Sequence, residues 1–324
     1  MVHTAQFYCE LSSDDIRKMM LKHNIGVNLI PSKLEEDFYG FSGAIVKEYI
    51  YYKFYLTVDF IKILNKTDIT ENDYDNIEKN IDLYMSKLCD LLCKDLTLTR
   101  LDYRIDVKLN NNKEREILIK LYRKLINKRG FKRKSLEEKT SIYYNTKSSV
   151  CCIYDKEKEA IDKRGVVQPF EEDTIRFEYR LYNRHLNNNK YAKKMDKSLK
   201  TYLKDELFIE YMSKNIEPLI YKGDYYKSFR VQTILNKSTL NEKEKNILTE
   251  FLNKVSKHGV TKVKNSVDNN GDLVYTKYKF NKIISQLEKL GINPVLIPKN
   301  LEGPSFIPNP FQIYINSTNV KKTA

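Results

Sequence analysis

Charged side chains alternate with apolar ones along two extended segments of the chain. Side chains two positions apart in a strand point to the same face of a sheet. In residues 100–107 and 176–181 the face opposite the apolar residues carries Arg100, Asp102, Arg104, Asp106, Arg176, Glu178 and Arg180. If the two segments are neighbours, that face combines carboxylates, which bind divalent cations, with guanidinium groups, which neutralise a phosphate. This combination suits phosphodiester chemistry.

A tyrosine in a third segment could supply an attacking oxygen. Residues 141–160 are typical of a β-hairpin whose second strand passes through Val150 and Cys152 to Tyr154, with Lys156 on the same side. A phenol has a pKa of about 10 and is a weak nucleophile at neutral pH, so it needs a cation or a base beside it. Lys156 could be that cation. The chain has 24 tyrosines, however, and the alternative that Tyr154 only completes a strand stays open.

The same alternation is also typical of a sheet with one solvent-exposed face, on which ion pairs hold the charges. The pattern alone does not separate this structural role from a catalytic one. Ten glycines are spread along the chain without forming a nucleotide-binding loop, so ATP hydrolysis is not expected.

Five strands and two helices are predicted to position these residues. The strands are residues 51–64, 98–109, the two arms of the hairpin, and 173–183. One helix begins at a capping box of Thr70 and Asp73 and runs to about Leu92, and another contains Ile117 to Leu125. The order predicts an α+β fold for residues 1–195, with an antiparallel sheet of about five strands and helices packed on one face.

Residues 196–324 are predicted to form a mostly helical region. Two helices flank a hairpin that turns at residues 268–271, which favours either a winged-helix-like DNA reader or a dimerisation region. In the first case Lys262, Lys264, Lys277 and Lys279 would lie at phosphates.

The net charge of +14 predicts attraction to polyanions such as nucleic acid, although residue usage typical of an AT-rich genome could explain part of it. No segment is apolar enough to span a membrane, and the first residues lack the form of a signal peptide. Five cysteines favour free thiols in a reducing cytoplasm. Cys89 and Cys93 are expected four residues apart on one helix.

Three motifs in fixed order resemble a known family. They are TRLDYRIDV (99–107), SIYYNTKSSVCCIYDKEKE (141–159) and IRFEYRLYNRHL (175–186). With the upstream segment 38–64, they resemble the rolling-circle replication initiators of filamentous phages, the gene II protein group, and the related replication initiation factors of Gram-positive plasmids and mobile elements. The likeness covers roughly residues 38–190.

The resemblance implies an enzyme that nicks one DNA strand with a single tyrosine, stays linked to the new 5′ end and later rejoins the strand. Tyr154, Lys156 and Glu159 occupy the motif Y-x-K-x-x-E, with Tyr154 as the nucleophile. Asp102 matches the R-[IL]-D motif and Glu178 the R-F-E motif, and both are expected, with Asp59 in the preceding strand, to bind Mg²⁺ or Mn²⁺. The usual relaxase His-hydrophobic-His motif is missing.

The partners implied are origin DNA, single-stranded or supercoiled, a host helicase and a DNA polymerase, with a homodimer as an option and no membrane. The DNA-binding residues are expected to be Arg100, Arg104, Arg176, Arg180, Lys132, Arg133 and Lys134. A conjugative relaxase is the nearest variant. The alternatives are a non-catalytic regulator that binds DNA or RNA on the same fold, and a metal nuclease that uses water as the nucleophile.

Overall fold

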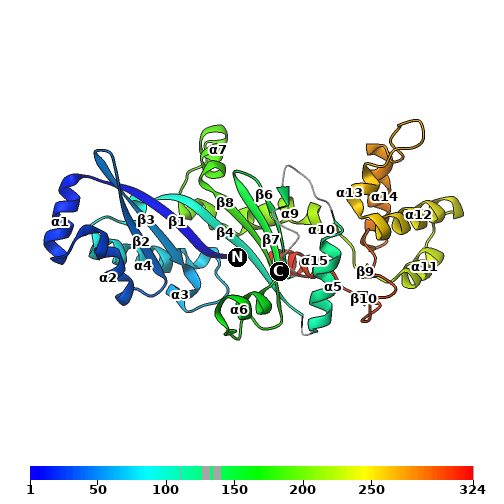
Figure 1. Cartoon of the computed structure of the whole chain (residues 1–324), viewed down its shortest axis with the longest axis horizontal. Coiled ribbons are helices and arrows are strands. Elements are labelled where there is room, and N and C mark those ends of the chain that lie inside the picture. The colour runs from blue at the N-terminus through cyan, green and yellow to red at the C-terminus, as the bar shows by residue number, and fades with distance from the viewer. Residues whose placement is uncertain (110, 126–131, 134–139, 324) are drawn as a thin grey trace. The chain divides into compact units, whose positions relative to one another are not determined.

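The structure of the chain is a computed structural model that describes residues 1–109, 111–125, 132–133 and 140–323. Its main sheet has eight strands in the order β2-β3-β1-β4-β8-β7-β6-β5 (Figure 1). These strands are β1 Val2–Leu11, β2 Phe41–Glu48, β3 Tyr51–Asp59, β4 Thr97–Lys108, β5 Lys132–Arg133, β6 Ser141–Asn145, β7 Ser149–Asp155 and β8 Thr174–Tyr182. The α+β class with an antiparallel sheet is confirmed.

The prediction of about five strands was too low. The sequence indicated β3, β4, β6, β7 and β8, but β1, β2 and the two-residue β5 were missed. Strand β2 contains Gly43 and Ser42, which are poor strand formers. The strand expected over residues 51–64 ends at Asp59, because the Asp59 carboxylate accepts hydrogen bonds from the backbone of Ile61 and Lys62 and starts helix α3 (Phe60–Leu64).

The chain divides into two compact units, each built from several segments. The first unit comprises Met1–Arg104, Lys147–Val150 and Glu178–Met212, and the second comprises Ile105–Thr146, Cys151–Phe177 and Ser213–Ala324. Strands β4, β7 and β8 therefore contribute residues to both units. The division into a catalytic region 1–195 and a C-terminal region 196–324 concerns function and stays a prediction.

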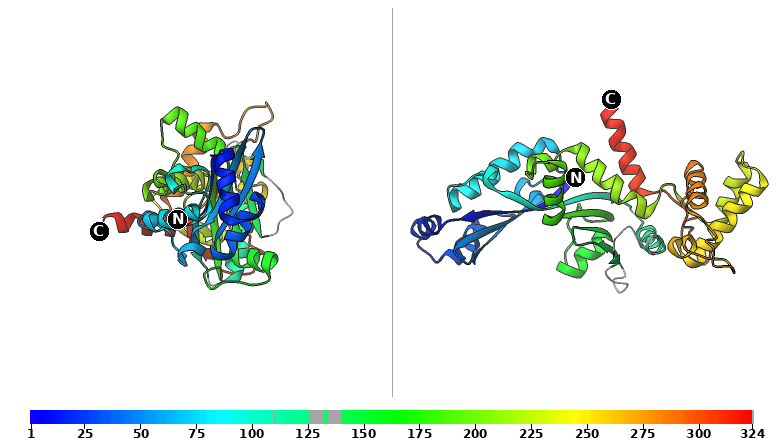
Figure 2. Two further views of the ribbon diagram at one scale, coloured as in Figure 1. Left: turned by 90° about the vertical axis from the view of Figure 1, so that its left-hand side faces the viewer. Right: turned by 90° about the horizontal axis from the view of Figure 1, so that it is seen from above.

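In the first unit, helix α4 (Tyr74–Leu88) lies along strands β1 to β3 (Figure 2). Its apolar residues recur at three- and four-residue intervals, and the ring of Tyr84 stacks on Phe41 with 4.7 Å between centroids. The predicted capping box of Thr70 and Asp73 is confirmed, in the 3₁₀ turn Glu71–Asp73 before α4. The other helices of this unit are α1 Ser13–His23, α2 Ile30–Asp37, α3, α7 Asn183–Lys193 and α8 Leu199–Tyr202, with a 3₁₀ turn at Val27–Leu29.

The cysteines only partly follow the prediction. Helix α4 ends at Leu88, so Cys89 and Cys93 do not share a helix, and Cys93 begins a 3₁₀ turn that ends at Asp95. The Asp82 carboxylate accepts a hydrogen bond from the backbone of Cys93. All five cysteines are free thiols, as predicted.

The second unit contains most of the remaining helices. They are α5 Asn112–Tyr122, α6 Lys156–Arg164, α10 Glu217–Ile220, α11 Ser228–Lys237, α12 Glu242–His258, α13 Val260–Lys264, α14 Lys277–Lys289 and α15 Pro310–Thr323, and α9 Asp205–Asn215 joins the two units in sequence. Strands β9 (Tyr225–Tyr226) and β10 (Phe306–Ile307) pair separately. In the core of the second unit, the aromatic rings of Tyr122, Phe177, Tyr225 and Phe311 pack edge to face. The mostly helical C-terminal region is confirmed.

The segment expected to form a helix, a hairpin and a helix has its two helices, but its hairpin is barely paired. The turn at Asp268–Gly271 is present, with Gly271 at φ +85°. Within the described residues only one isolated bridge, between Val267 and Leu273, joins its arms. Lys262 and Lys264 lie on α13, and Lys277 and Lys279 lie on α14. None of the helices described is long and apolar enough to cross a membrane.

Candidate active site

Two carboxylates from neighbouring strands and one histidine form a cluster in the first unit. Asp102 on β4 and Glu178 on β8 are 0% and 2% exposed. His3 on β1 joins them, and one ligand atom of each of the three residues lies within 4.8 Å of the other two. The predicted proximity of Asp102 and Glu178 is therefore found, with an imidazole beside them.

His3 was not predicted as part of the site, because it lies outside the three motifs and far from them in the sequence. Strand β1 pairs with β4 so that Val2 lies opposite Tyr103 and Thr4 opposite Asp102, and the register shifts between these two pairs. This irregularity places His3 beside Asp102, with 3.9 Å between His3 Nε2 and Asp102 Oδ2. The alternating segment 2–11 would have signalled a strand, but its partner strand cannot be read from sequence.

The two carboxylates are held by arginines. Arg100 donates to both oxygens of Asp102, at 2.8 and 2.5 Å, and Arg180 Nε lies 3.2 Å from Asp102 Oδ2 and donates from its NH2 group to Glu178. Burial raises the pKa of Asp102 and the charge of Glu178 raises it further, against the opposing effect of Arg100 and Arg180. A divalent cation would stabilise both carboxylates in their charged form.

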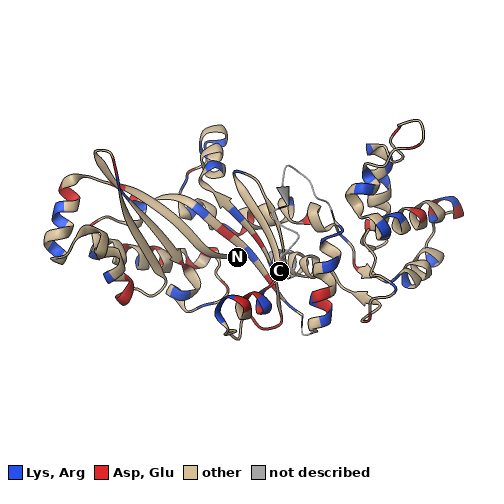
Figure 3. Ribbon diagram, viewed as in Figure 1, with Lys and Arg blue, Asp and Glu red and all other residues tan. Residues whose placement is uncertain are grey.

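The face of β4 and β8 that carries the charged residues is not exposed to solvent, as it would be if the charges only formed ion pairs on a wet sheet face. Besides Asp102 and Glu178, Arg104 and Arg176 are less than 5% exposed. Acidic and basic bands run along the central strands β4 and β8 (Figure 3). Burying charged groups is costly unless they are paired or bind an ion, so this arrangement is more specific than an ordinary wet sheet face.

Tyr154 lies near the end of β7 in the second unit and is 7% exposed. The guanidinium of Arg176 lies 6.0 Å from the centroid of its ring. Arg176 also donates two hydrogen bonds to Asp106, at 2.6 and 2.8 Å. The cation beside the tyrosine is thus an arginine oriented by a carboxylate.

Lys156 and Glu159 belong to a helix, which corrects the expectation that Lys156 continues the strand of Tyr154. Asp155 ends β7 and caps α6, accepting a hydrogen bond from the backbone of Lys158. The ammonium group of Lys156 lies 2.6 Å from Glu159 and 3.2 Å from Glu171. Lys156 is 8% exposed, so these carboxylates hold its charge inside the protein.

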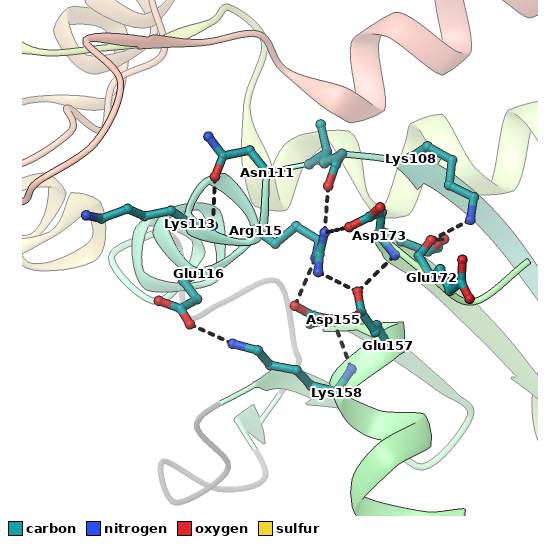
Figure 4. A network of polar contacts seen from close by, with 12 residues as sticks. Lys108, Asn111, Lys113, Arg115, Glu116, Asp155, Glu157, Lys158, Glu172 and Asp173 are labelled. Carbon is teal, nitrogen blue, oxygen red and sulfur yellow. Dashed lines mark hydrogen bonds and ion pairs between the residues drawn. The ribbon is translucent and has the colours of Figure 1, made fainter. Parts of the chain in front are cut away.

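Arg115 on α5 fixes the backbone next to Tyr154. It is 1% exposed and donates to Asp155, Glu157 and Asp173, at 3.2, 2.5 and 2.7 Å (Figure 4). Asp155 follows Tyr154 at the end of β7, and Asp173 precedes β8, the strand of Arg176. Arg115 therefore ties the end of one strand to the start of the other. Nothing in the sequence motifs indicated this role.

The remaining predicted residues have other surroundings. Asp59 caps helix α3 and lies outside the cluster of His3, Asp102 and Glu178. Arg104 donates to the carbonyl oxygen of Thr67. Lys132 and Arg133 form β5, but their side chains, and the whole of Lys134, lie outside the described residues.

Residues 65–204 match a family model that describes the N-terminal part of the phage replication-associated protein, the gene II protein. This match includes Tyr154 and both buried carboxylates. It confirms the resemblance to the gene II protein group of filamentous phages and supports a rolling-circle replication initiator. No curated protein matches the chain significantly.

Proposed function

We propose that this chain nicks one strand of origin DNA with Tyr154 and later rejoins it, and so initiates rolling-circle replication. The observation that carries the proposal is the match of residues 65–204 to the N-terminal family of the phage replication-associated protein, because this segment contains Tyr154, Asp102 and Glu178. The buried pairing of Asp102 with Glu178 supports it, because two carboxylates rarely share a buried site without a role.

In the nicking step the hydroxyl oxygen of Tyr154 attacks the scissile phosphorus. The tyrosine hydroxyl gives up its proton to solvent as the new ester bond forms and the bond from phosphorus to the 3′ oxygen breaks. The 3′ oxygen leaves with the bonding electrons and takes up a proton, and the DNA stays joined to the protein through a 5′-phosphotyrosine. The positive charge of Arg176 beside the ring would favour the phenolate and the charged transition state. The free 3′ hydroxyl can then prime a polymerase.

Rejoining is the reverse reaction. A 3′ hydroxyl attacks the phosphotyrosine, the phosphodiester bond re-forms and Tyr154 leaves with its proton restored. The number of phosphoester bonds does not change, so no ATP is needed. Strand separation and synthesis would then fall to a separate helicase and polymerase of the host.

His3, Asp102 and Glu178 are the residues that would hold the divalent cation. When bound, the ion would polarise the scissile phosphate and neutralise its developing charge. Mg²⁺ prefers oxygen ligands almost exclusively, whereas an imidazole is better tolerated by a transition metal. Of the two cations expected, the donor set therefore favours Mn²⁺. Arg100 and Arg180, which share Asp102 and Glu178, would orient the phosphate.

A non-catalytic DNA-binding regulator is the second candidate. It is favoured by one observation, that Arg100 and Arg180 already neutralise the two carboxylates. In that case Tyr154 would only stack on a base or complete β7.

Covalent linkage separates the two candidates. The purified chain is incubated with Mn²⁺ and supercoiled plasmids that carry the DNA flanking its own gene, and the products are resolved under denaturing conditions. We expect nicked circles and a protein band that carries DNA. Binding without any covalent adduct would favour the regulator, and nicking without an adduct would favour a nuclease that uses water.

A further inference from the structure

A cavity of about 340 Å³ lies in the second unit, where the end of α5 meets the corner between α12 and α13. Five of the residues that line it carry basic side chains. They are Arg123, Lys124, Lys257, His258 and Lys262. Of the described residues that line this cavity, none is acidic. The cavity, which we call the α5–α12 groove, is therefore suited to an anion.

The α5–α12 groove is built on a fixed junction. The backbone of Val260 donates to the carbonyl oxygen of Lys124 at 3.0 Å, and Lys124 Nζ donates to the carbonyl oxygen of Ser256 at 2.9 Å. Gly259, with φ +78°, lets the α12–α13 corner approach α5, because a Cβ there would lie 3.0 Å from the Lys124 carbonyl oxygen. The groove is thus held by a backbone hydrogen bond and by the Lys124 side chain, and neither contact involves the ammonium groups of Lys257 and Lys262.

Lys257 and Lys262 are both exposed, and no acidic partner is found for either among the described side chains. By contrast, Lys245 and Lys254 on the same helix α12 pair with Glu242 and Glu250. The charges of Lys245 and Lys254 are therefore compensated locally, whereas no acidic partner is described for Lys257 or Lys262. Uncompensated cations in a concave surface attract polyanions.

Arg123 connects the α5–α12 groove with a second cavity of about 340 Å³ that is also lined by Lys120, Lys158 and Asp155. Asp155 directly follows Tyr154 in the chain. In this second cavity Lys158 pairs with Glu116 at 2.7 Å (Figure 4). The two cavities therefore share Arg123, and the second also contains Lys120 and the Lys158–Glu116 ion pair.

We propose that the α5–α12 groove binds the phosphodiester backbone of DNA that extends from the cleavage site. The proposal rests on the proposed nicking function, because Tyr154 defines where the DNA in the groove comes from. It assigns a DNA-holding role to part of residues 196–324. Lys257 and Lys262 would neutralise successive phosphates, and Arg123 would receive the strand on the side of Tyr154. Blue bands mark the basic residues of α12 and α13 (Figure 3).

Salt dependence of DNA binding tests the proposal. We would measure the affinity of the full chain for a short duplex and for a single strand, both of arbitrary sequence, between about 50 and 200 mM salt. Each neutralised phosphate contributes about 0.9 to the slope of log affinity against log salt for duplex DNA and about 0.7 for a single strand. Lys257→Gln with Lys262→Gln should therefore lower the slope by about 1.8 or about 1.4.

The matched control replaces two other lysines, Lys237→Gln with Lys243→Gln. Lys237 ends α11 and Lys243 lies in the first turn of α12, so the same charge is removed away from the groove. We expect the control to keep the wild-type slope. A change confined to one of the two DNA probes identifies which form the groove holds. An unchanged slope in the groove variant, or an equal fall in the control, would overturn the proposal.

Failure of the groove and failure of the nicking function give different results. The groove variant should still form the covalent adduct on a short single strand that contains only the cleavage site, at saturating DNA. Tyr154→Phe should lose the adduct and keep the salt slope. An adduct formed by Tyr154→Phe would count against the nicking mechanism alone, and a wild-type slope in the groove variant would count against the groove alone.

Discussion

The guanidinium of Arg176 lies 6.0 Å from the ring centroid of Tyr154 and is held there by two hydrogen bonds to Asp106. This relationship assigns the cation beside the proposed nucleophile to β8. The sequence motif favoured Lys156 for that role, but Lys156 is paired with Glu159 and Glu171. The two residues should therefore differ in their effect on the rate of nicking.

Arg176→Gln should slow adduct formation by about 10²-fold, because removing one preorganised group that stabilises transition-state charge typically has an effect of this size. Lys156→Gln should slow it much less, since the charge of Lys156 is already neutralised by its carboxylate partners. The measurement is the initial rate of adduct formation at saturating DNA. A large loss in Lys156→Gln together with a near wild-type rate in Arg176→Gln would return the role to Lys156.

Mn²⁺ should raise the melting temperature of the wild-type chain, because a ligand that binds only the folded state stabilises it. The rise should disappear in His3→Gln and in Glu178→Gln. It should persist in Asp59→Asn, which removes a charge outside the cluster and keeps an oxygen that can cap α3. A rise that persists in His3→Gln and disappears in Asp59→Asn would restore Asp59 as a ligand in place of His3.

Asp102→Asn should change the free energy of unfolding by about 1 kcal/mol or less. Burial and the charge of Glu178 raise the pKa of Asp102, so removing its charge offsets the hydrogen bonds lost from Arg100. The side chains of Arg100 and Arg180 are 23% and 26% exposed, so neither is left as a fully buried charge. Unfolding in urea measures the change, with Asp59→Asn as the comparison. A loss of about 3–5 kcal/mol would show that the ionised Asp102 is a net stabiliser of the fold.

Glu171 should make stability sensitive to acid. Burial opposes its ionisation, but hydrogen bonds from Arg164 and from the backbone of Gln168, with the charge of Lys156, lower its pKa to about 2. In the unfolded chain the pKa returns to about 4.3. The stabilisation is therefore present above about pH 4.3 and is lost as the pH falls toward 2.

Glu171→Gln should accordingly unfold more easily than the wild type at pH 7, and the difference should shrink as the pH falls through this window. Urea unfolding at several pH values measures it. Glu172→Gln, at the neighbouring exposed position, is the control and should show no such trend. A constant difference at all pH values would contradict the pKa assignment.

The outcome for the fold shows what the sequence could and could not predict. Period-two alternation correctly indicated β4, β7 and β8, because each strand has strongly apolar residues on one side. It did not reveal that their charged side is buried as well, since burial there depends on elements distant in sequence. His3 was missed for the same reason, because its place depends on the register between β1 and β4.

The error at Lys156 was avoidable from local signals. Asp155 is a good N-cap residue, the residues after it are strong helix formers, and Gly165 ends the helix at φ +69°. These signals outweigh the alternation of Val150, Cys152 and Tyr154, which the sequence analysis extended to Lys156. In this chain the motif Y-x-K-x-x-E therefore covers a strand end and a helix start, and only Lys156 and Glu159 lie together on the helix, paired at 2.6 Å.

The central claim is that the hydroxyl of Tyr154 is the nucleophile, and peptide mapping of the covalent adduct tests it most directly. Tyr154→Phe keeps the ring against Arg176 and removes one hydroxyl, so it should lose about 1 kcal/mol of stability or less. Tyr143→Phe, on β6, is the matched control. We expect wild type and Tyr143→Phe to carry DNA on the peptide that contains Tyr154, and Tyr154→Phe to form no adduct while it still binds DNA. DNA found on any other tyrosine, or an adduct formed by Tyr154→Phe at the wild-type rate, would contradict the account.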